Sequence, residues 1–298
     1  MYRKLVALGI STDRIFTIDT TTGQADQVYA DTGASPDGLQ IAGGVAYWTT
    51  MGTPIQHPDK GDGESALDYS TPNGGVHAIN VDGTGRRDLT APGDITTGKQ
   101  LVCHGDRLYW GDREGHRVSR IRIDGSDRQD LVVNEPGIEN QCVGVAVDAA
   151  GEQLYWTQKG PAKGGVGKIL RAPVQIAAGE TPQTRTDIEV LWAHLPEPID
   201  LEIADGTLYW TDRGAPPNGN TLNRAPIPAP GEPGATPEIL ADGFEEAIGL
   251  VVDTEADTVY VSDLGGSVYA VPLTGSADHG KRLVANLATH LSGIAGMV

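Results

Sequence analysis

The sequence predicts an all-β protein, a six-bladed β-propeller of four-stranded antiparallel blades in which residues 1–298 form a single domain. The first observation is a repeat: Tyr-Trp pairs begin at Tyr47, Tyr109, Tyr155 and Tyr209, and a reduced copy, "TVYVSD", surrounds Tyr260. The steps between these tyrosines are 62, 46, 54 and 51 residues, a period typical of propellers and solenoids. The second observation is composition, since 40 glycines and 19 prolines indicate many short elements joined by tight turns.

Each repeat carries four short strand patterns, and this number favours the propeller. A small, apolar segment such as "AIGLVVD" (247–253) comes first, and the aromatic segment follows it. An alternating segment such as "GSVYAVPL" (266–273) and a last segment such as "KRLVAN" (281–286) complete the repeat. Because Asp-Gly and glycine-rich turns join antiparallel neighbours, the four segments predict one blade.

The two ends of the chain are predicted to share the last blade. The C-terminal end carries a lone first strand, "LSGIAGMV" (291–298). The N-terminal end supplies three strands, "KLVALGIS" (4–11), "RIFTID" (14–19) and "ADQVYA" (25–30). We therefore expect one C-terminal and three N-terminal strands to close the ring.

An insertion at residues 51–75 accounts for the 62-residue step. A segment of this length inside a compact repeat is usually functional or disordered. Since strands alternate in direction, loops between second and third strands open on the face where the inner strands begin. The insertion is therefore predicted to be a rim loop and, if ordered, a lid over the channel that carries His57.

Charge and cysteine content limit the expected partners and compartment. The net charge of −18 repels nucleic acid and anionic membrane surfaces, and no stretch approaches about 18 consecutive apolar residues. A small-molecule substrate is therefore expected, with no nucleic-acid or membrane partner. The two cysteines, Cys103 and Cys142, and the lack of a secretory apolar run near the N-terminus predict a cytoplasmic protein. Short edge strands favour a monomer.

The Tyr-Trp pairs are interpreted as scaffold. The tryptophans stand at the same place in successive repeats, as expected of side chains that fill the space between neighbouring sheets. Asp112, Asp212 and Asp263, in the positions after these strands, are predicted to bind backbone at a blade edge.

One position directly ahead of each inner strand is polar in all six repeats. Inner strands line the central channel of a propeller, and ligands usually bind where these strands begin. The six residues are Ser35, Thr97, Gln141, Glu197, Glu246 and His290. Two carboxylates and a histidine on one axis form an acid/base set. The alternative explanation is that loop residues are polar in any case.

Further candidates lie deeper in the strands and on the rim. Gln100 and Asp200 replace a glycine that four other repeats keep, and a carboxylate at such a crowded axis needs a partner, a metal or water. Asp37 and Lys99 occupy the position one residue earlier in the first two repeats. The rim cations are Arg113, Lys159 and Arg213, which either hold an anionic or carbonyl group of a ligand or form ion pairs between blades.

These repeats resemble a known family. The Tyr-Trp-Thr-Asp strand, followed by segments such as "HRVSRIRIDG" and "RQDLVV", resembles the YWTD propellers of low-density lipoprotein receptor type over essentially the whole chain. Longer strings, including "YWTDRGAPPNGNTLNRAP", resemble a group of stand-alone microbial YWTD proteins. Some similar propellers act in natural-product pathways, including as hetero-Diels-Alder cyclases. The resemblance implies the fold, whereas propellers host many unrelated activities.

Three functional hypotheses follow. The first is an enzyme that performs elimination, isomerisation or cyclisation, of hetero-Diels-Alder type if the resemblance extends to activity, with Glu197, Asp200, Glu246 and His290 as catalytic residues. It needs no cofactor. The second is a metal-dependent, lactonase-like hydrolase in which calcium binds the oxygens of Asn140, Glu197, Asp200 and Glu246. The third is a propeller that binds a ligand or a protein without chemistry.

Overall fold

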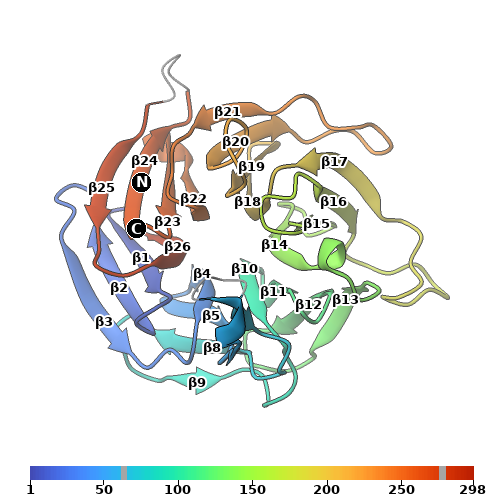
Figure 1. Cartoon of the computed structure of the whole chain (residues 1–298), viewed down its shortest axis with the longest axis horizontal. Helices are drawn as coiled ribbons and strands as arrows, with labels where there is room; N and C mark the ends of the chain where they lie inside the picture. Colours follow the sequence, from blue (N-terminus) through green and yellow to red (C-terminus); the bar gives the residue numbers. More distant parts are fainter. Residues whose placement is uncertain (62–65, 275–279) are drawn as a thin grey trace.

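The computed structural model describes residues 1–61, 66–274 and 280–298. Within them, six four-stranded antiparallel sheets stand as blades around a central axis (Figure 1). The first strand of each sheet lies innermost. The prediction of an all-β, six-bladed propeller is confirmed.

Blades 1 to 5 follow one another along the chain. Blade 1 contains β4 (Pro36–Ala42), β5 (Val45–Thr50), β8 (Gly75–Asn80) and β9 (Arg87–Asp88). Blade 2 contains β10 (Gly98–His104), β11 (Arg107–Asp112), β12 (Arg117–Arg122) and β13 (Gln129–Val133). Blade 3 contains β14 (Cys142–Val147), β15 (Gln153–Gln158), β16 (Gly167–Pro173) and β17 (Glu189–Leu195). Blade 4 contains β18 (Pro198–Ala204), β19 (Thr207–Asp212), β20 (Thr221–Pro226) and β21 (Glu238–Ala241). Blade 5 contains β22 (Ala247–Asp253), β23 (Thr258–Asp263), β24 (Ser267–Pro272) and β25 (Arg282–Asn286).

The closing blade joins the two ends of the chain, as predicted. Its strand order is β26 (Leu291–Met297), β1 (Lys4–Gly9), β2 (Arg14–Asp19) and β3 (Ala25–Ala30). Strands β26 and β1 pair antiparallel, so that Leu5 lies opposite Gly296 and Val6 opposite Ala295. The last sheet therefore needs residues from both ends to form.

The tryptophans of the repeat fill the space between blades. Trp48, Trp110, Trp156 and Trp210 are each at most 1% exposed. Trp156 of blade 3, for example, packs in one cluster with Val132 of blade 2. Burying large aromatic side chains supplies much of the stabilisation of such cores. The scaffold interpretation of these residues agrees with the structure.

The aspartates of the repeat bind backbone, also as expected. The Asp112 carboxylate accepts hydrogen bonds from the amides of Thr96 and Thr97, at 3.1 and 2.7 Å. The carboxylate of Asp212 accepts from the amide of Glu197 at 3.0 Å. Burial raises the pKa of Asp212 to about 7, against the effect of its backbone partners. Each aspartate thus holds the chain just ahead of an inner strand.

The threonine of the repeat joins neighbouring blades, a role that sequence reasoning did not assign. Thr157 Oγ1 accepts from the Gly144 amide at 2.7 Å and donates to the Ile199 carbonyl of the next blade at 2.8 Å. The inner strands approach so closely that a Cβ on Gly144 would lie 2.1 Å from that carbonyl. In blade 2, Gly111 replaces the threonine because a Cβ there would lie 2.5 Å from the Val143 carbonyl.

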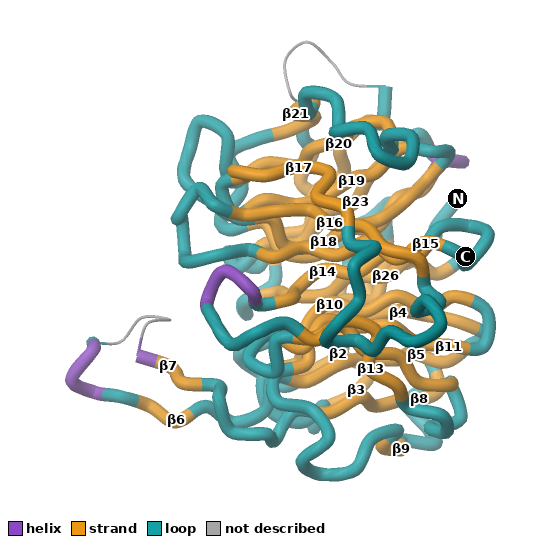
Figure 2. The backbone as a smooth tube through the Cα atoms, turned by 90° about the vertical axis from the view of Figure 1, so that its right-hand side faces the viewer, coloured by secondary structure: helices purple, strands orange, loops and turns teal. Residues whose placement is uncertain are grey.

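The insertion projects from one face of the ring (Figure 2). It contains the two-stranded sheet of β6 (Ile55–Gln56) and β7 (Leu67–Asp68), with the single turn η1 (Pro58–Lys60). Residues 62–65 of the predicted rim loop lie outside the described residues. Two further helical turns among the described residues are η3 (Ile138–Asn140) and η4 (Thr254–Ala256). In the described part of the chain, no helix has the length and apolar character needed to cross a membrane.

Candidate functional site

The six polar positions lie where the sequence predicts them. The residues immediately ahead of β4, β10, β14, β18, β22 and β26 are Ser35, Thr97, Gln141, Glu197, Glu246 and His290. The structure brings three of them, Ser35, Glu246 and His290, to one cavity. The other three have different surroundings.

The cavity at the channel mouth, here named the mouth cavity, has a volume of about 530 Å³. It lies on the side of the insertion, which contributes to its wall. Its lining residues are Ile10, Ser11, Ser35, Asp37, Met51, Leu67, Tyr69, Lys99, Arg113, Arg213, Glu246, Ile248, Leu264, His290 and Ser292. They come from the starts of inner strands, from the loops that follow β1, β11, β19 and β23, and from the insertion.

Lys99 is a largely buried cation of the mouth cavity, 8% exposed. Its ammonium pairs with the Asp37 carboxylate and lies 3.4 Å from Met51 Sδ. Gln100 Nε2 donates to the second Asp37 oxygen at 3.0 Å. Burial lowers the pKa of Lys99, Asp37 opposes this effect, and the positive charges of Arg113 and Arg213 add to it. The positive charges of Lys99, Arg113 and Arg213 therefore lie close enough to affect one another in this part of the cavity.

The two arginines reach the cavity from opposite loops. Arg113 Nε donates to both oxygens of Glu114, at 2.7 and 2.9 Å, and its guanidinium lies 5.4 Å from the ring centroid of Tyr69. The Tyr69 hydroxyl lies 3.3 Å from Ser35 Oγ. Arg213 NH1 lies 3.6 Å from a Glu246 oxygen. The insertion thus contacts the same groups that line the channel mouth.

Glu197 lies behind this wall, in a buried ion-pair cluster. Its side chain is 1% exposed, and its Oε1 accepts from Lys159 Nζ at 3.1 Å and from Arg213 Nε at 2.8 Å. The Lys163 amide donates to the other oxygen at 2.8 Å. Lys159 belongs to blade 3 and Glu197 to blade 4, so for this pair the alternative of an inter-blade ion pair describes the geometry. Glu197 contacts the lining of the mouth cavity through Arg213, and Lys163, whose amide binds Glu197, also places its Nζ 3.7 Å from a Glu246 oxygen.

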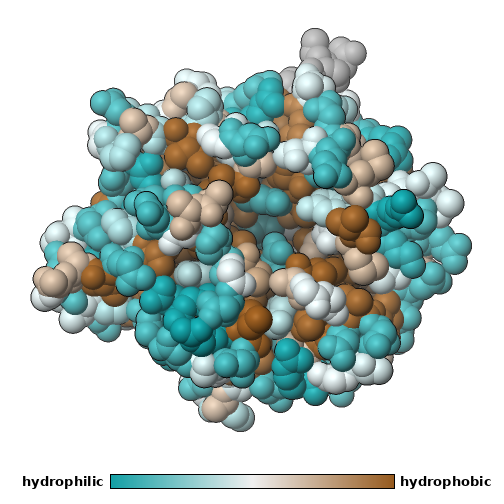
Figure 3. Space-filling model, turned by 180° about the vertical axis from the view of Figure 1, so that it is seen from behind, coloured by the Kyte–Doolittle hydropathy of each residue, from teal (hydrophilic) through white to brown (hydrophobic). Residues whose placement is uncertain are grey.

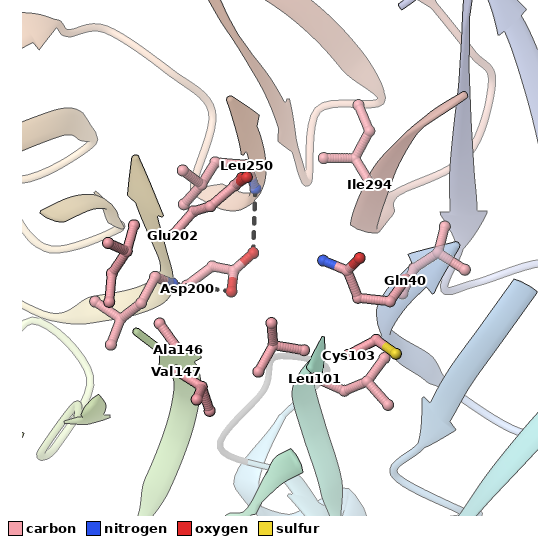
Figure 4. A pocket seen from close by; sticks show the side chains of 13 residues that line it. Gln40, Leu101, Cys103, Ala146, Val147, Asp200, Glu202, Leu250 and Ile294 are labelled. Carbon is pink, nitrogen blue, oxygen red and sulfur yellow. Dashed lines mark hydrogen bonds between the residues drawn. The ribbon is translucent and has the colours of Figure 1, made fainter. Parts of the chain in front are cut away.

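Asp200 faces a second cavity of about 190 Å³, here named the lower cavity (Figure 4). Its carboxylate accepts from the amides of Leu201 and Leu250, at 2.9 and 3.2 Å. Glu202, two residues further along β18, accepts from the Val252 amide at 2.8 Å. Burial is the main cause that raises the pKa of both Asp200 and Glu202 to about 8.

Sequence reasoning missed Glu202, although a signal was present. Residues two apart on a strand face the same side, so Asp200 in the channel places Glu202 there too. Glu202 and Gln40 also line a larger hollow of about 570 Å³ toward the opposite face, where the centre of the ring is recessed (Figure 3). Cys103, a free thiol, lines the lower cavity as well.

Five predicted binding residues are absent from the described lining of the mouth cavity: Thr97, Gln100, Gln141, Lys159 and His57. Thr97 Oγ1 donates to the Tyr69 carbonyl at 2.9 Å and therefore anchors the insertion. Gln141 follows η3 at the start of β14. His57 lies 3.6 Å from Asp68 within the insertion.

The four proposed calcium ligands do not converge. Asn140 Nδ2 donates to the Glu135 carbonyl at 3.0 Å, while Glu197, Asp200 and Glu246 lie in three different surroundings as described above. Across residues 1–61, 66–274 and 280–298, no three His, Cys, Asp or Glu side chains are grouped so that they could hold a metal ion.

Comparison with known proteins gives two relatives of similar identity. No family model matches the chain. A Pyricularia oryzae protein named low-density lipoprotein receptor-related protein 1 is 38% identical over 259 residues, which cover 80% of this chain and 78% of the relative. A Cochliobolus heterostrophus protein named 3-hydroxyacyl-CoA dehydrogenase-like protein LAM1 is 38% identical over 264 residues. These cover 81% of this chain and 52% of that relative, so the chain spans about half its length.

Solved structures share the fold at low identity. A chain of the nidogen–laminin complex has a TM-score of 0.70 and 18% identity, with 98% of this chain and 97% of that chain covered. A candidate 6-phosphogluconolactonase from Bacteroides uniformis has a TM-score of 0.57 and 14% identity, with 95% and 82% covered. With the first relative and the six-bladed architecture, these findings show that the chain belongs to the YWTD propeller family of low-density lipoprotein receptor type.

Proposed function

We propose that the protein is an enzyme that acts on a small organic molecule in the mouth cavity by general acid/base catalysis. The observation that carries the proposal is that His290 and Glu246, from adjacent blades, line one cavity with three largely buried cations. A volume of about 530 Å³ lies within the usual range for small-molecule sites.

The proposed roles follow from chemistry and position. Glu246 removes a proton from a carbon atom of the substrate, and His290 delivers a proton to another carbon in an isomerisation or to the leaving group in an elimination. In a cyclisation, including the hetero-Diels-Alder type, the same two side chains, Glu246 and His290, polarise the reacting group of the substrate. The cations orient the substrate. Asp200 lies in the lower cavity, and Glu197 positions Arg213 rather than lining the mouth cavity. Of the four catalytic residues expected from sequence, the proposal therefore keeps Glu246 and His290.

Backbone conformation supports a functional mouth. Ser35 and Glu246 adopt φ of 54° and 60°, a region in which residues with a side chain are strained. Side chains of neighbouring blades hold both positions: Asp13 Oδ1 accepts from the Ser35 amide and Asn220 Oδ1 from the Glu246 amide, each at 3.1 Å. Such strain is found preferentially at active sites and ligand clamps.

The relative named dehydrogenase-like protein LAM1 lends further support to an enzymatic context, although the chain spans only 52% of it. A place in natural-product biosynthesis, a cytoplasmic location and a monomeric state belong to the same proposal.

The test is an untargeted search for turnover. The protein is incubated with a mixed extract of small molecules, and mass spectrometry follows which compounds are consumed and which appear. His290→Ala and Glu246→Gln should each reduce turnover at least 100-fold with little change in melting temperature, because both side chains are at least partly exposed. His104→Ala, a histidine at the other end of an inner strand, is the matched control. Full turnover by both mouth variants would refute the proposal.

A second candidate is a propeller that binds without chemistry. It is favoured by the relative named as receptor-related and by the structural similarity to a chain of the nidogen–laminin complex. In this case a compound is retained by the protein and recovered unchanged. The same incubation distinguishes the two functions.

A further inference from the structure

We infer that the hollow on the face opposite the mouth, here named the rear hollow, binds an organic cation, with its ammonium group at Glu202 and its apolar body against the rim (Figure 3). The described linings of the rear hollow and of the mouth cavity have no residue in common. The inference therefore goes beyond the proposed function and does not depend on it.

The rear hollow has room for an organic molecule. Its volume of about 570 Å³ lies within the usual range for small-molecule sites. It shares Gln40 and Glu202 with the lower cavity, so the two spaces adjoin at these side chains. Gln40 extends toward Asp200 and Glu202 from the opposite side of the channel (Figure 4). A ligand that enters from the rear face therefore meets these polar groups at its inner end.

The rim of the rear hollow is apolar. The apolar side chains of its lining include Tyr2, Ile41, Val81, Val251 and Met297. All of these except Val251 are only half-buried, so they present apolar surface to the hollow. Removing such surface from water favours the binding of an apolar group. The rim thus suits the body of an organic ligand and would add nothing to the binding of a bare ion.

The two carboxylates at the inner end have no cation to balance them. In the described part of the chain, the partners of Asp200 and Glu202 are the backbone amides of Leu201, Leu250 and Val252. The described linings of the lower cavity and the rear hollow contain no lysine, arginine or histidine. Burial is the main cause that raises the pKa of both carboxyl groups to about 8, as expected where no positive charge compensates. An ammonium group at Glu202 supplies the missing charge.

The carboxylates of the mouth half already have cations of their own. Asp37 pairs with Lys99, and an oxygen of Glu246 lies 3.6 Å from Arg213. A cationic ligand is repelled by these groups and attracted by the unbalanced carboxylates of the lower half. Binding of an organic cation to this protein therefore reports on the rear of the channel.

The negative charge reaches the rim of the rear hollow. Burial raises the pKa of Tyr2 to about 12, and the negative charges of Glu202, Asp253 and Glu255 contribute to this rise. The net charge of −18 also favours the approach of cations from solution.

Binding of a cation should depend on pH. An ammonium group favours the ionised carboxylate, so binding releases protons and affinity increases as the pH rises toward the pKa of about 8. The other titratable groups in the two linings are Cys103 and Tyr2. Burial raises the pKa of both, so neither group ionises below pH 8.5. Lys99 and Asp37, deeper in the channel, act on Asp200 with opposite signs.

The test compares a matched pair of probes at pH 8.5 and low ionic strength, 3-phenylpropylamine and the neutral 3-phenylpropan-1-ol. Isothermal titration calorimetry should show at least 10-fold tighter binding of the amine, with affinity that falls as salt is added. At pH 6 the amine should bind at least 10-fold more weakly than at pH 8.5. Its ammonium group, with a pKa near the lysine value of about 10.4, stays charged at both pH values.

Variants locate the site. Glu202→Gln keeps an oxygen that can accept the Val252 amide but removes the charge, so the amine should bind at least 10-fold more weakly at pH 8.5. Asp205→Asn is the matched control, because Asp205 lies exposed in the turn after the same strand and asparagine tolerates its φ of 47°. Thermal unfolding checks that both variants fold. If Glu202→Gln does not fold, Val81→Lys on the rim tests the same site, since its charge should weaken binding at least 10-fold.

Four outcomes would overturn the inference. Equal binding of the alcohol would show an apolar hollow without preference for a cation, and absence of binding by both probes would show no site. Equal losses in Glu202→Gln and Asp205→Asn would show attraction by surface charge alone. Displacement of the amine by calcium at the same concentration would assign the carboxylates to a metal ion. None of these results involves the mouth cavity, so each leaves the proposed function standing.

Discussion

The two halves of the channel hold their buried or half-buried carboxylates in different ways. In the mouth half, Asp37 pairs with Lys99, and Glu197 pairs with Lys159 and Arg213. In the lower half, Asp200 accepts hydrogen bonds from backbone amides, as does Glu202. Both halves belong to the same ring of inner strands, so the difference lies in the side chains that the neighbouring blades provide.

The comparison shows what a buried carboxylate requires. An amide N–H carries only a partial positive charge, and for Asp200 two such donors do not offset the loss of hydration, so burial raises its pKa to about 8. A full positive charge at close range interacts far more strongly. The two mouth-half carboxylates Asp37 and Glu197 are therefore held by ion pairs, whereas Asp200 and Glu202 in the lower half are expected to change protonation near neutral pH.

The largest effect on stability is expected when the Glu197 carboxylate of the mouth half is replaced by a neutral group. Glu197→Gln removes the buried carboxylate that Lys159 and Arg213 share, while Arg213 keeps its contact with Glu246, and the free energy of unfolding should fall by about 3 kcal/mol. Urea denaturation measures the loss. Asp106→Asn is the control, because Asp106 pairs with Arg122 and the two side chains are 58% and 42% exposed, and such a pair contributes less than about 1 kcal/mol. Equal losses in the two variants would remove the distinction between the buried cluster and an outer ion pair.

A smaller, pH-dependent effect is expected in the lower half. The pKa of Asp200 is raised from its ordinary value of 3.8 to about 8, so the folded protein holds more protons than the unfolded chain between these values. This contribution to stability is complete below the lower value and is lost as the pH rises through the upper one. Asp200→Asn removes the titration, so its stability relative to the unmodified protein should increase from pH 5 to pH 9. Across this pH range the shift corresponds to about 4 kcal/mol, and the solvent that still reaches the half-buried Asp200 reduces the expected increase to about 1–2 kcal/mol.

Urea denaturation at pH 5 and pH 9 provides the measurement for this variant. Asp26→Asn is the control, because Asp26 lies exposed on β3 and should not change the pH profile. If Asp200→Asn and the unmodified protein have parallel profiles, Asp200 does not titrate in this range and the contrast between the halves is weaker than described.

The smallest effect is expected at the contact between the insertion and the mouth. Tyr69→Phe removes the hydroxyl that lies 3.3 Å from Ser35 Oγ but keeps the ring beside Arg113. Stability should fall by about 0.5 kcal/mol, as for a partly exposed hydrogen bond. Thermal unfolding detects this change. Tyr69→Ala, which also removes the ring from the cavity wall, should in addition reduce turnover in the proposed function, and unchanged turnover would separate the insertion from the site.

Prediction from sequence succeeded where position in the repeat decides the outcome. Alignment of the repeats placed Ser35, Glu246 and His290 directly ahead of inner strands, and the structure places them there. It could not distinguish Glu197 from Glu246, which occupy the same position in successive blades. The difference is made by Lys159, which is 38 residues away along the chain and pairs with Glu197 across the blade boundary.

The sequence by itself determined the propeller, the number of blades and the closure of the ring by both ends, because strand alternation and a repeated aromatic pair report local, periodic packing. Only the tertiary structure decided that Lys99, Arg113 and Arg213 share a cavity with Glu246 and His290. The structure also places Asp200 in the lower cavity, apart from these five residues. The physical reason is that a site of this kind is assembled from side chains of several blades, and their direction depends on contacts between residues far apart in the chain.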